Sequence, residues 1–278
     1  MSSDILITKA NGQSEPFDIE KLGNSFKRAK VSKPVADQIT HHILQELEEG
    51  MTTKEIYRHA FSLLHKLEHR TALRYSLRKA ILDLGPSGFP FEQMVAEILK
   101  SLGYTTLTDQ MVKGRCADHE VDVVAWKPGS LIMSEVKYHG QEGLKSDLKI
   151  VLYVKARFDD LSKMMHDYGT HPQELTEGWL VTNTKFTTTA IKYAECQNLK
   201  VIGWNYPLDG NLHDFIDAAQ LHPLTCLHTL SEHDKKALLD RKIVLCKTLE
   251  EDKSILKSIG LSETNAEAVL EEIKMISQ

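Results

Sequence analysis

Residues 119–137 read HEVDVVAWKPGSLIMSEVK, and this stretch decides the fold of the middle of the chain. Two runs of mostly apolar, often β-branched residues flank Lys127-Pro128-Gly129-Ser130. Such runs are typical of β-strands, and Pro-Gly between them is typical of a tight turn. The stretch therefore predicts a β-hairpin of two antiparallel strands.

Charged side chains gather on one side of this hairpin. Because successive side chains of a strand alternate between faces, Glu135 and Lys137 project to one side of the sheet and Val136 to the other. Asp122 on the partner strand reaches the same side. Two carboxylates on one face favour a divalent cation between them, and carboxylate oxygens suit Mg²⁺ or Mn²⁺. The same residues also fit a solvated sheet face that carries a Glu/Lys pair.

The flanking segments place the hairpin in a mixed α/β domain. Upstream, apolar residues at 91, 94, 95, 98, 99 and 102 follow helical spacing, and Gly103 is a natural helix end. Downstream, a helix through residues 144–158 is followed by a strand from Gly178, a helix around 190–194 and a strand over 199–204. The predicted order is therefore helix, strand hairpin, helix, strand, helix, strand.

Residues 88 to 204 resemble the Mrr-like branch of the PD-(D/E)xK restriction endonucleases. The resemblance rests on the Phe91-Glu92 helix, the Asp122…Glu135-x-Lys137 hairpin and the unit that begins Val181-Thr182-Asn183 and continues through Phe186-Thr187. Three separated segments agree in order and spacing. The resemblance implies a mixed-sheet nuclease core that hydrolyses DNA phosphodiester bonds with Mg²⁺ or Mn²⁺.

The resemblance also assigns roles to single residues. Asp122 and Glu135 are implied to bind the metal, and Lys137 to orient the attacking water or stabilise the developing charge. Glu92 is implied to complete the catalytic site from the helix. Asp118 and Glu120 either add metal contacts or are solvated surface residues.

Four further side chains are candidates for DNA contact. His139 follows Lys137 where the strand leaves the expected site. Lys145, Lys149 and Arg157 lie in the predicted helix over 144–158, and cations at helical spacing are placed to contact phosphates. The alternative is a solvated amphipathic face.

The first 84 residues have a different pattern. Residues 5–17 predict two short strands around Asn11-Gly12, and Asp18 is a candidate N-cap for the helix that follows. Further helices are expected at about 34–49, 53–68 and 70–84. The motif K-x-x-G-x-x-E-x-F-D-x-x-K-L from Lys9 and the terminal A-x-R-Y resemble the ATP-cone, the nucleotide-sensing domain of ribonucleotide reductases and their repressor.

The resemblance to the ATP-cone implies a bound nucleoside triphosphate, ATP or dATP. Lys9 and Lys21 are implied to hold the phosphates, Glu15 to shape the site, and Thr53 and Tyr57 to lie near the nucleotide. Lysines are suitable point-charge ligands for phosphate. The sequence departs from the family at Ala10, where the family has arginine, so one phosphate contact is missing. The alternative is a fold retained for packing or oligomerisation without a ligand.

Length and composition support three domains. A chain of 278 residues is expected to form two or three domains. Gly85-Pro86-Ser87-Gly88 is a short breaker run, and we expect an ATP-cone over 1–84, a nuclease domain over 88–206 and a helical module over 207–278. The sequence contains neither a transmembrane run nor a signal-peptide profile at its start, and its 4 cysteines lack metal-ligand spacing. We therefore expect a cytoplasmic protein with reduced, mostly buried thiols and no membrane partner.

Helices are expected at 227–239, 249–256 and 263–276 of the last module. Ile259-Gly260-Leu261 resembles the turn of a helix-hairpin-helix, which would offer backbone N–H groups to phosphate. The alternative is a packing or oligomerisation module, and we expect a homo-oligomer. The net charge of −5 argues against an avid DNA binder, so DNA affinity is expected to be modest and assisted by metal.

These observations predict a nucleotide-responsive, Mg²⁺-dependent DNA endonuclease that serves in restriction or phage defence. The alternative is a non-catalytic nucleotide-sensing protein that binds DNA or regulates another process. The intact Asp122, Glu135 and Lys137 favour the endonuclease.

Overall fold

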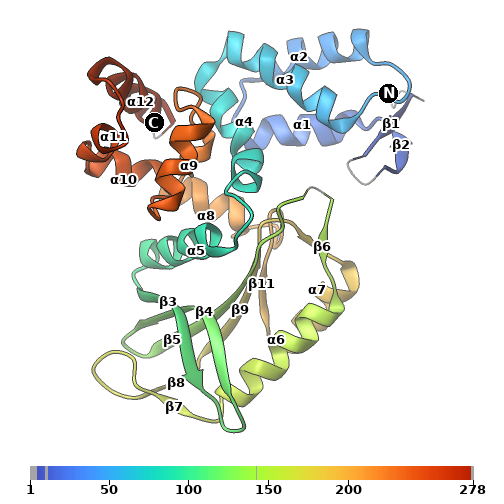
Figure 1. Ribbon diagram of the computed structural model, residues 1–278. Helices are drawn as coiled ribbons and strands as arrows, with labels where there is room; N and C mark the ends of the chain where they lie inside the picture. Colours follow the sequence, from blue (N-terminus) through green and yellow to red (C-terminus); the bar gives the residue numbers. More distant parts are fainter. Residues whose placement is uncertain (1–4, 10–11, 142, 277–278) are drawn as a thin grey trace.

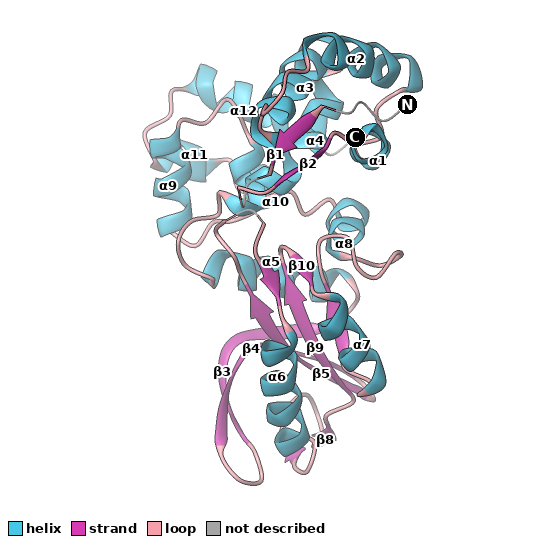
Figure 2. Ribbon diagram, turned by 90° about the vertical axis from the view of Figure 1, so that its right-hand side faces the viewer, coloured by secondary structure: helices cyan, strands magenta, loops and turns pink. Residues whose placement is uncertain are grey.

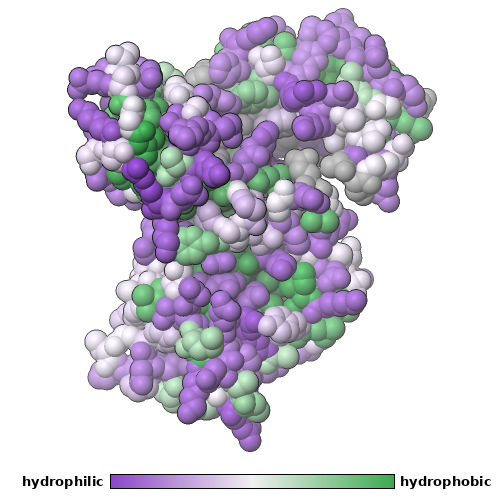
Figure 3. Space-filling view, in the orientation of Figure 1, coloured by the Kyte–Doolittle hydropathy of each residue, from purple (hydrophilic) through white to green (hydrophobic). Residues whose placement is uncertain are grey.

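The computed structural model describes residues 5–9, 12–141 and 143–276. It shows a helical N-terminal part, a central mixed sheet covered by helices and a helical C-terminal part (Figure 1). This confirms the fold class expected from the sequence. In the space-filling view the molecule narrows between the two helical parts and the sheet below them (Figure 3). Among the described residues, no helix combines the length and apolar character needed to span a membrane.

The N-terminal part is a two-stranded sheet with four helices. Its elements are β1 Leu6–Thr8, β2 Ser14–Pro16, α1 Ile19–Arg28, α2 Lys33–Glu46, α3 Thr53–Leu67 and α4 His69–Leu82. The strands pair antiparallel with Ile7 opposite Glu15. Asp18 caps α1 by accepting hydrogen bonds from the N–H groups of Glu20 and Lys21, which confirms the expected cap. Ala10 and Asn11 lie outside the described residues.

The central part is a five-stranded sheet with helices on both faces (Figure 2). Its main elements are α5 Phe89–Ser101, β3 Thr105–Lys113, β4 Asp118–Lys127, β5 Ser130–Lys137, α6 Leu148–Leu161, β9 Glu177–Thr182, α7 Thr188–Cys196, β11 Lys200–Ile202 and α8 Leu212–Ala219. Short strands β6 Lys145–Ser146 and β10 Lys185–Phe186 pair with each other, as do β7 Met165–His166 and β8 Gln173–Glu174.

The order of the large sheet is β11-β9-β5-β4-β3. Strands β11, β9 and β5 run parallel, and the hairpin β4–β5 and the edge strand β3 are antiparallel. Val123 and Val136 face the side covered by α5 and α8, and Val124 and Met133 face the side covered by α6 and α7. The turn of the hairpin lies at Pro128-Gly129, where Gly129 has a φ of 77° that favours glycine.

The structure contains elements of this part that were not predicted from the sequence, namely β3, the short strands β6, β7, β8 and β10, and helix α8. Strand β3 was not predicted, because it is an edge strand of mostly polar residues that lacks a continuous apolar face. The helix predicted over 144–158 begins only at Leu148, since Asp147 accepts hydrogen bonds from the N–H groups of Lys149 and Ile150. Lys145 therefore lies in β6, not in the helix.

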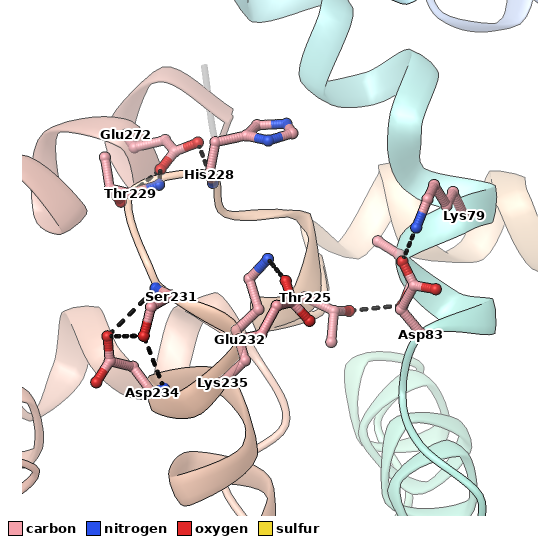
Figure 4. Close-up of polar contacts among 11 residues, drawn as sticks. Lys79, Asp83, Thr225, His228, Thr229, Ser231, Glu232, Asp234, Lys235 and Glu272 are labelled. Atoms are coloured by element: carbon pink, nitrogen blue, oxygen red, sulfur yellow. Dashed lines mark hydrogen bonds and ion pairs between the residues drawn. The ribbon is translucent and has the colours of Figure 1, made fainter. Parts of the chain in front are cut away.

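The C-terminal part packs short helices on one another. Its elements are the 3₁₀ turn η1 Leu224–Cys226 and helices α9 Glu232–Asp240, α10 Cys246–Glu251, α11 Ser254–Ser258 and α12 Glu263–Ile276. Figure 4 shows how Glu272 of α12 holds the segment before α9: its carboxylate accepts hydrogen bonds from the N–H groups of His228 and Thr229 at 2.8 and 2.9 Å. Because Glu272 is only 4% exposed, these bonds supply partners for a carboxyl group that is almost shielded from water.

Several expectations for this part were wrong in detail. The helix predicted over 227–239 starts at Glu232, because residue Ser231 is an N-cap with a capping box. The helix predicted over 249–256 is divided into α10 and α11. The expectation of mostly buried thiols holds only for Cys226 and Cys246 of this part, whereas Cys116 and Cys196 of the central part are exposed.

Helix α4 contributes to the cores of all three parts. Ala72 and Tyr75 pack in the N-terminal core, Leu77 and Ile81 pack with α5 in the central core, and Ala80 packs with the C-terminal helices. The hydroxyl of Thr225 in η1 donates to the carbonyl oxygen of Ala80 at 2.6 Å. The three parts are therefore joined by a shared helix.

Candidate active site

Asp122 and Glu135 lie where the β4–β5 ladder ends. The last pair of the ladder is Val123 with Ser134, so the next residues along the two strands are Asp122 and Glu135. The Val136 N–H donates a hydrogen bond of 2.6 Å to Asp122 Oδ2. The carboxylate thus replaces a strand partner and is held toward β5.

Arg157 of α6 joins this cluster. Its guanidinium makes a very short ion pair with Glu135 and also donates to the carbonyl oxygen of Glu120 at 2.8 Å. The side chains of Arg157 and Glu135 are 11% and 18% exposed. Arg157 also bonds the hydroxyl of Tyr153, one turn earlier on α6. The structure therefore places Arg157 inside the carboxylate cluster, and not on an open surface beside Lys149.

Burial disfavours the charged form of the carboxylates in the cluster. It raises the pKa of Glu135 to about 7, with the charge of Asp122 as the second cause, while Arg157 and Lys137 act in the opposite direction. Burial likewise raises the pKa of Asp122, against the hydrogen bond from Val136. Two such groups side by side are what a cation would stabilise.

Glu92 of α5 belongs to the same electrostatic cluster. Its pKa is raised to about 7, first by burial and then by the charges of Asp122, Asp109 and Glu120. Asp109, in β3, has a φ of 56°, which is rare for a residue other than glycine. The structure thus brings Glu92 near Asp122, and Glu120 also lies close enough to raise the pKa of Glu92. Asp118 is exposed at the start of β4.

Lys137 is the exposed last residue of β5, and buried polar groups fix the chain around it. Thr182 Oγ1 donates to the Lys137 carbonyl oxygen at 2.8 Å. The Asn183 amide bonds the His139 N–H and carbonyl oxygen at 2.8 and 2.9 Å, and His139 Nε2 lies 3.2 Å from Ser146 Oγ. Asn183 is 1% exposed, so Thr182 and Asn183 position the loop from within the fold.

A cationic surface lies beside this loop. Lys145 and Lys185 are register partners in the β6–β10 pair, and Lys149 is exposed at the start of α6. The pKa of Lys185 is lowered first by burial and then by the charge of Arg78 on α4, followed by that of Lys145. Lys185 and Arg78 were missed in the sequence, because neither lies in a charge run.

The N-terminal candidates also converge. Lys9 Nζ and Lys21 Nζ lie 2.5 and 3.1 Å from the carboxylate of Glu15, which lowers the pKa of that carboxylate, chiefly through Lys9. Thr52, the N-cap of α3, forms a parallel bridge with Thr8 of β1, so Thr53 and the first turn of α3 begin beside β1. The ring of Tyr57 stacks on that of Tyr75 at 5.1 Å.

Comparisons with known proteins define the class. Family profiles match residues 5–82 as an ATP cone domain, residues 85–205 as a restriction endonuclease domain and residues 222–277 as an AF1548-like C-terminal domain. The chain thus joins an ATP-cone to a nuclease domain of the restriction endonuclease type.

An uncharacterised protein of Archaeoglobus fulgidus is 33% identical over 183 residues, which are 66% of this chain and 99% of that protein. The crystal structure of protein of unknown function AF1548 is similar with a TM-score of 0.56 and 32% identity over 69% of this chain and 98% of that one. The chain belongs to this AF1548-like family. The MspJI restriction endonuclease in complex with a 27-mer oligonucleotide matches with a TM-score of 0.32 and 14% identity, covering 69% of this chain and 36% of that one.

The raised pKa of Glu92 predicts a pH-dependent effect of removing its charge. Because its folded-state pKa of about 7 exceeds the ordinary 4.5, the stability that protonated Glu92 contributes is lost as the pH rises through about 7. Glu92→Gln cannot ionise. We expect the variant to exceed the wild type in Tm by about 2–4 °C near pH 8, after allowance for solvent screening, and by almost nothing near pH 5.

Thermal unfolding at both pH values measures this difference. Glu97→Gln is the matched control on the same helix, because Glu97 is paired with Lys100 at 2.5 Å. Its Tm difference from the wild type should not grow with pH. An equal Tm for Glu92→Gln and the wild type near pH 8 would contradict the assignment of Glu92 to the cluster.

Proposed function

We propose that this protein is a DNA endonuclease that hydrolyses phosphodiester bonds with Mg²⁺ or Mn²⁺ and is regulated by a nucleoside triphosphate bound to its ATP-cone. The observation that carries the proposal is the meeting of Asp122, Glu135 and Lys137 at the end of the β4–β5 ladder of a restriction endonuclease domain. Cutting foreign DNA in restriction or phage defence is the role that this activity would serve.

The residues present fit a hard divalent cation. Asp122 and Glu135 would hold it, because carboxylate oxygens are the ligands that Mg²⁺ and Mn²⁺ prefer. Their raised pKa values support this, since a cation takes the place of the proton that burial otherwise favours. When bound, the ion would supply positive charge at the scissile phosphate and make a bound water more acidic.

The other groups of the cluster would serve the same reaction. Lys137 would orient the attacking water or neutralise the charge that develops on the phosphate. Glu92, with a pKa of about 7, is suited to exchange a proton near neutral pH. Arg157 would act as a positioning residue, because its ion pair holds the carboxylate of Glu135.

The cationic surface indicates where the DNA backbone would lie. Lys145 and Lys185 sit side by side on the short strands beyond the site, and Arg78 brings a third charge from α4. The Nε of Arg78 is buried and has no hydrogen-bond partner among the described residues. A phosphate backbone that passes this surface would relieve the repulsion between the cations, with Lys149 and the loop at His139 nearby.

Two contacts support regulation by the nucleotide. The hydroxyl of Tyr138, the residue after Lys137, donates to the Leu82 carbonyl oxygen at the end of α4, at 2.7 Å. Lys30, just after α1, forms an ion pair of 2.5 Å with Asp217 of α8. A shift of α4 on nucleotide binding would therefore reach the segment that carries Lys137, and a shift of α1 would reach α8 beside the sheet. The nucleotide would change activity by as much as it prefers one arrangement of these helices.

Plasmid cleavage tests the proposal. We expect supercoiled plasmid to be nicked or linearised with Mg²⁺ or Mn²⁺, and not after chelation of the metal with EDTA. The cleavage rates measured with ATP, with dATP and without nucleotide should differ from one another. Gel electrophoresis over time, with the same amount of protein in each reaction, measures all of these rates.

The outcomes separate the two candidate functions. DNA binding without cleavage under every metal and nucleotide would overturn the endonuclease and favour the non-catalytic sensor. Cleavage at a rate that no nucleotide changes would retain the nuclease and remove the regulatory half of the proposal.

A further inference from the structure

Three side chains of metal-ligand type meet on the surface of the ATP-cone. They are His42 and Glu46 of α2 and His59 of α3, and one ligand atom of each lies within 4.8 Å of the other two. His42 Nε2 is 3.2 Å from Glu46 Oε1, and His59 Nδ1 is 3.2 Å from Glu46 Oε2. The two imidazole rings meet edge to face with their centres 5.1 Å apart.

The helix packing fixes this arrangement. His42 and Glu46 are one turn apart on α2, so both project from the same face of that helix. Ile43, next to His42, is 2% exposed, and Ala60, next to His59, is fully buried in the same core. The backbone of each helix is therefore anchored at the position from which a ligand projects.

The distances and the ligand types suit a transition metal. Two atoms that each bind a tetrahedral zinc ion at about 2.0–2.2 Å are about 3.3–3.5 Å apart, close to the two distances of 3.2 Å between the imidazole nitrogens and the Glu46 oxygens. Two imidazoles and one carboxylate form a set of three protein ligands that leaves a fourth position for water. Imidazole nitrogen favours Zn²⁺, Co²⁺, Ni²⁺ and Cu²⁺ over Mg²⁺.

We propose that His42, Glu46 and His59 form a second metal site, which binds Zn²⁺ or a similar transition metal ion and fastens α2 to α3. The carboxylate of Glu46 now lies between the two rings and is 51% exposed, so it has room to turn one oxygen toward an ion. The site differs in ligand chemistry from the carboxylate cluster of the nuclease, and its existence does not depend on nuclease activity. Tyr57 lies two residues before His59 on α3.

Calorimetric titration of the full chain with Zn²⁺ tests the site, after chelator treatment and with Mg²⁺ in excess to occupy the nuclease carboxylates. We expect the wild type to bind with one site per chain that His42→Ala/His59→Ala weakens by roughly tenfold or more. His41→Ala is the matched control, because His41 precedes His42 and is hydrogen-bonded to Gln45 at 3.0 Å. It should bind Zn²⁺ like the wild type.

Two further measurements keep the outcome decisive. Glu46→Gln keeps the size of the side chain and should also weaken Zn²⁺ binding. It is the variant to measure if circular dichroism shows that the double variant does not fold. Titration with Co²⁺ should give visible absorption without the near-ultraviolet band of a thiolate ligand, which distinguishes this site from the exposed Cys116 and Cys196. A wild type without such a Zn²⁺ site, or folded variants that bind equally tightly, would overturn the proposal.

Discussion

Plasmid cleavage is expected to fall by on the order of a thousandfold or more in Asp122→Asn, while the protein stays folded. The substitution removes one of the two partly buried carboxylates that would hold the metal. It keeps the shape of the side chain and an oxygen that can accept the hydrogen bond from the Val136 N–H. Rates of nicking under saturating Mg²⁺, with circular dichroism and Tm as measures of folding, give the result. Glu135→Ala and Lys137→Ala should lose cleavage to a similar extent.

Asp118→Asn is the matched control for this loss. Asp118 lies on the same strand but is exposed at its start, so the substitution removes the same charge outside the cluster. Its cleavage rate should remain close to that of the wild type. Wild-type nicking by folded Asp122→Asn would show that the catalytic site is elsewhere in the molecule.

The second large effect is expected on the affinity of the protein for nucleotide. Lys9→Ala/Lys21→Ala should weaken binding of ATP and dATP by about a hundredfold, because two charge-assisted contacts to phosphate are lost. The substitution also leaves Glu15 without the two ammonium groups that now surround it, and its carboxylate would repel the phosphates. Isothermal titration calorimetry with each nucleotide measures the change in Kd.

Lys33→Ala/Lys54→Ala provides the control, since it removes two exposed lysines of the same domain and changes the net charge equally. Its nucleotide affinity should match that of the wild type. Equal affinity in the Lys9/Lys21 double variant would place any nucleotide at a different site.

Coupling between the two sites is tested with Asp122→Asn and with Ca²⁺ in place of Mg²⁺. Saturating DNA should then shift the affinity of the protein for nucleotide, because coupling between two binding sites is reciprocal.

Local patterns predicted a large part of this molecule. The β4–β5 hairpin, α5 and the capping of α1 by Asp18 follow from alternation, helical spacing and a cap residue, all of which act over a few neighbours. The candidate site could be assembled because Asp122 and Glu135 lie on adjacent strands of one hairpin. Glu92 was assigned only through the resemblance to a family.

Contacts between distant segments could not be predicted in this way. The ion pair of Arg157 with Glu135 depends on how α6 lies against the sheet, and no spacing in the sequence encodes that. The same holds for Asn183, whose amide binds a loop 44 residues earlier in the chain. The polar edge strand β3 was missed because it buries too little apolar surface to leave a clear pattern.

Helix α4 also bears on how such a chain can change over generations. Family profiles divide the sequence at the end of this helix, yet Leu77, Ala80 and Ile81 are buried against segments that belong to the neighbouring domains. A cone exchanged for another would have to carry a last helix with apolar residues at all three positions. The joint in the sequence is therefore not a place where one cone can be exchanged freely for another.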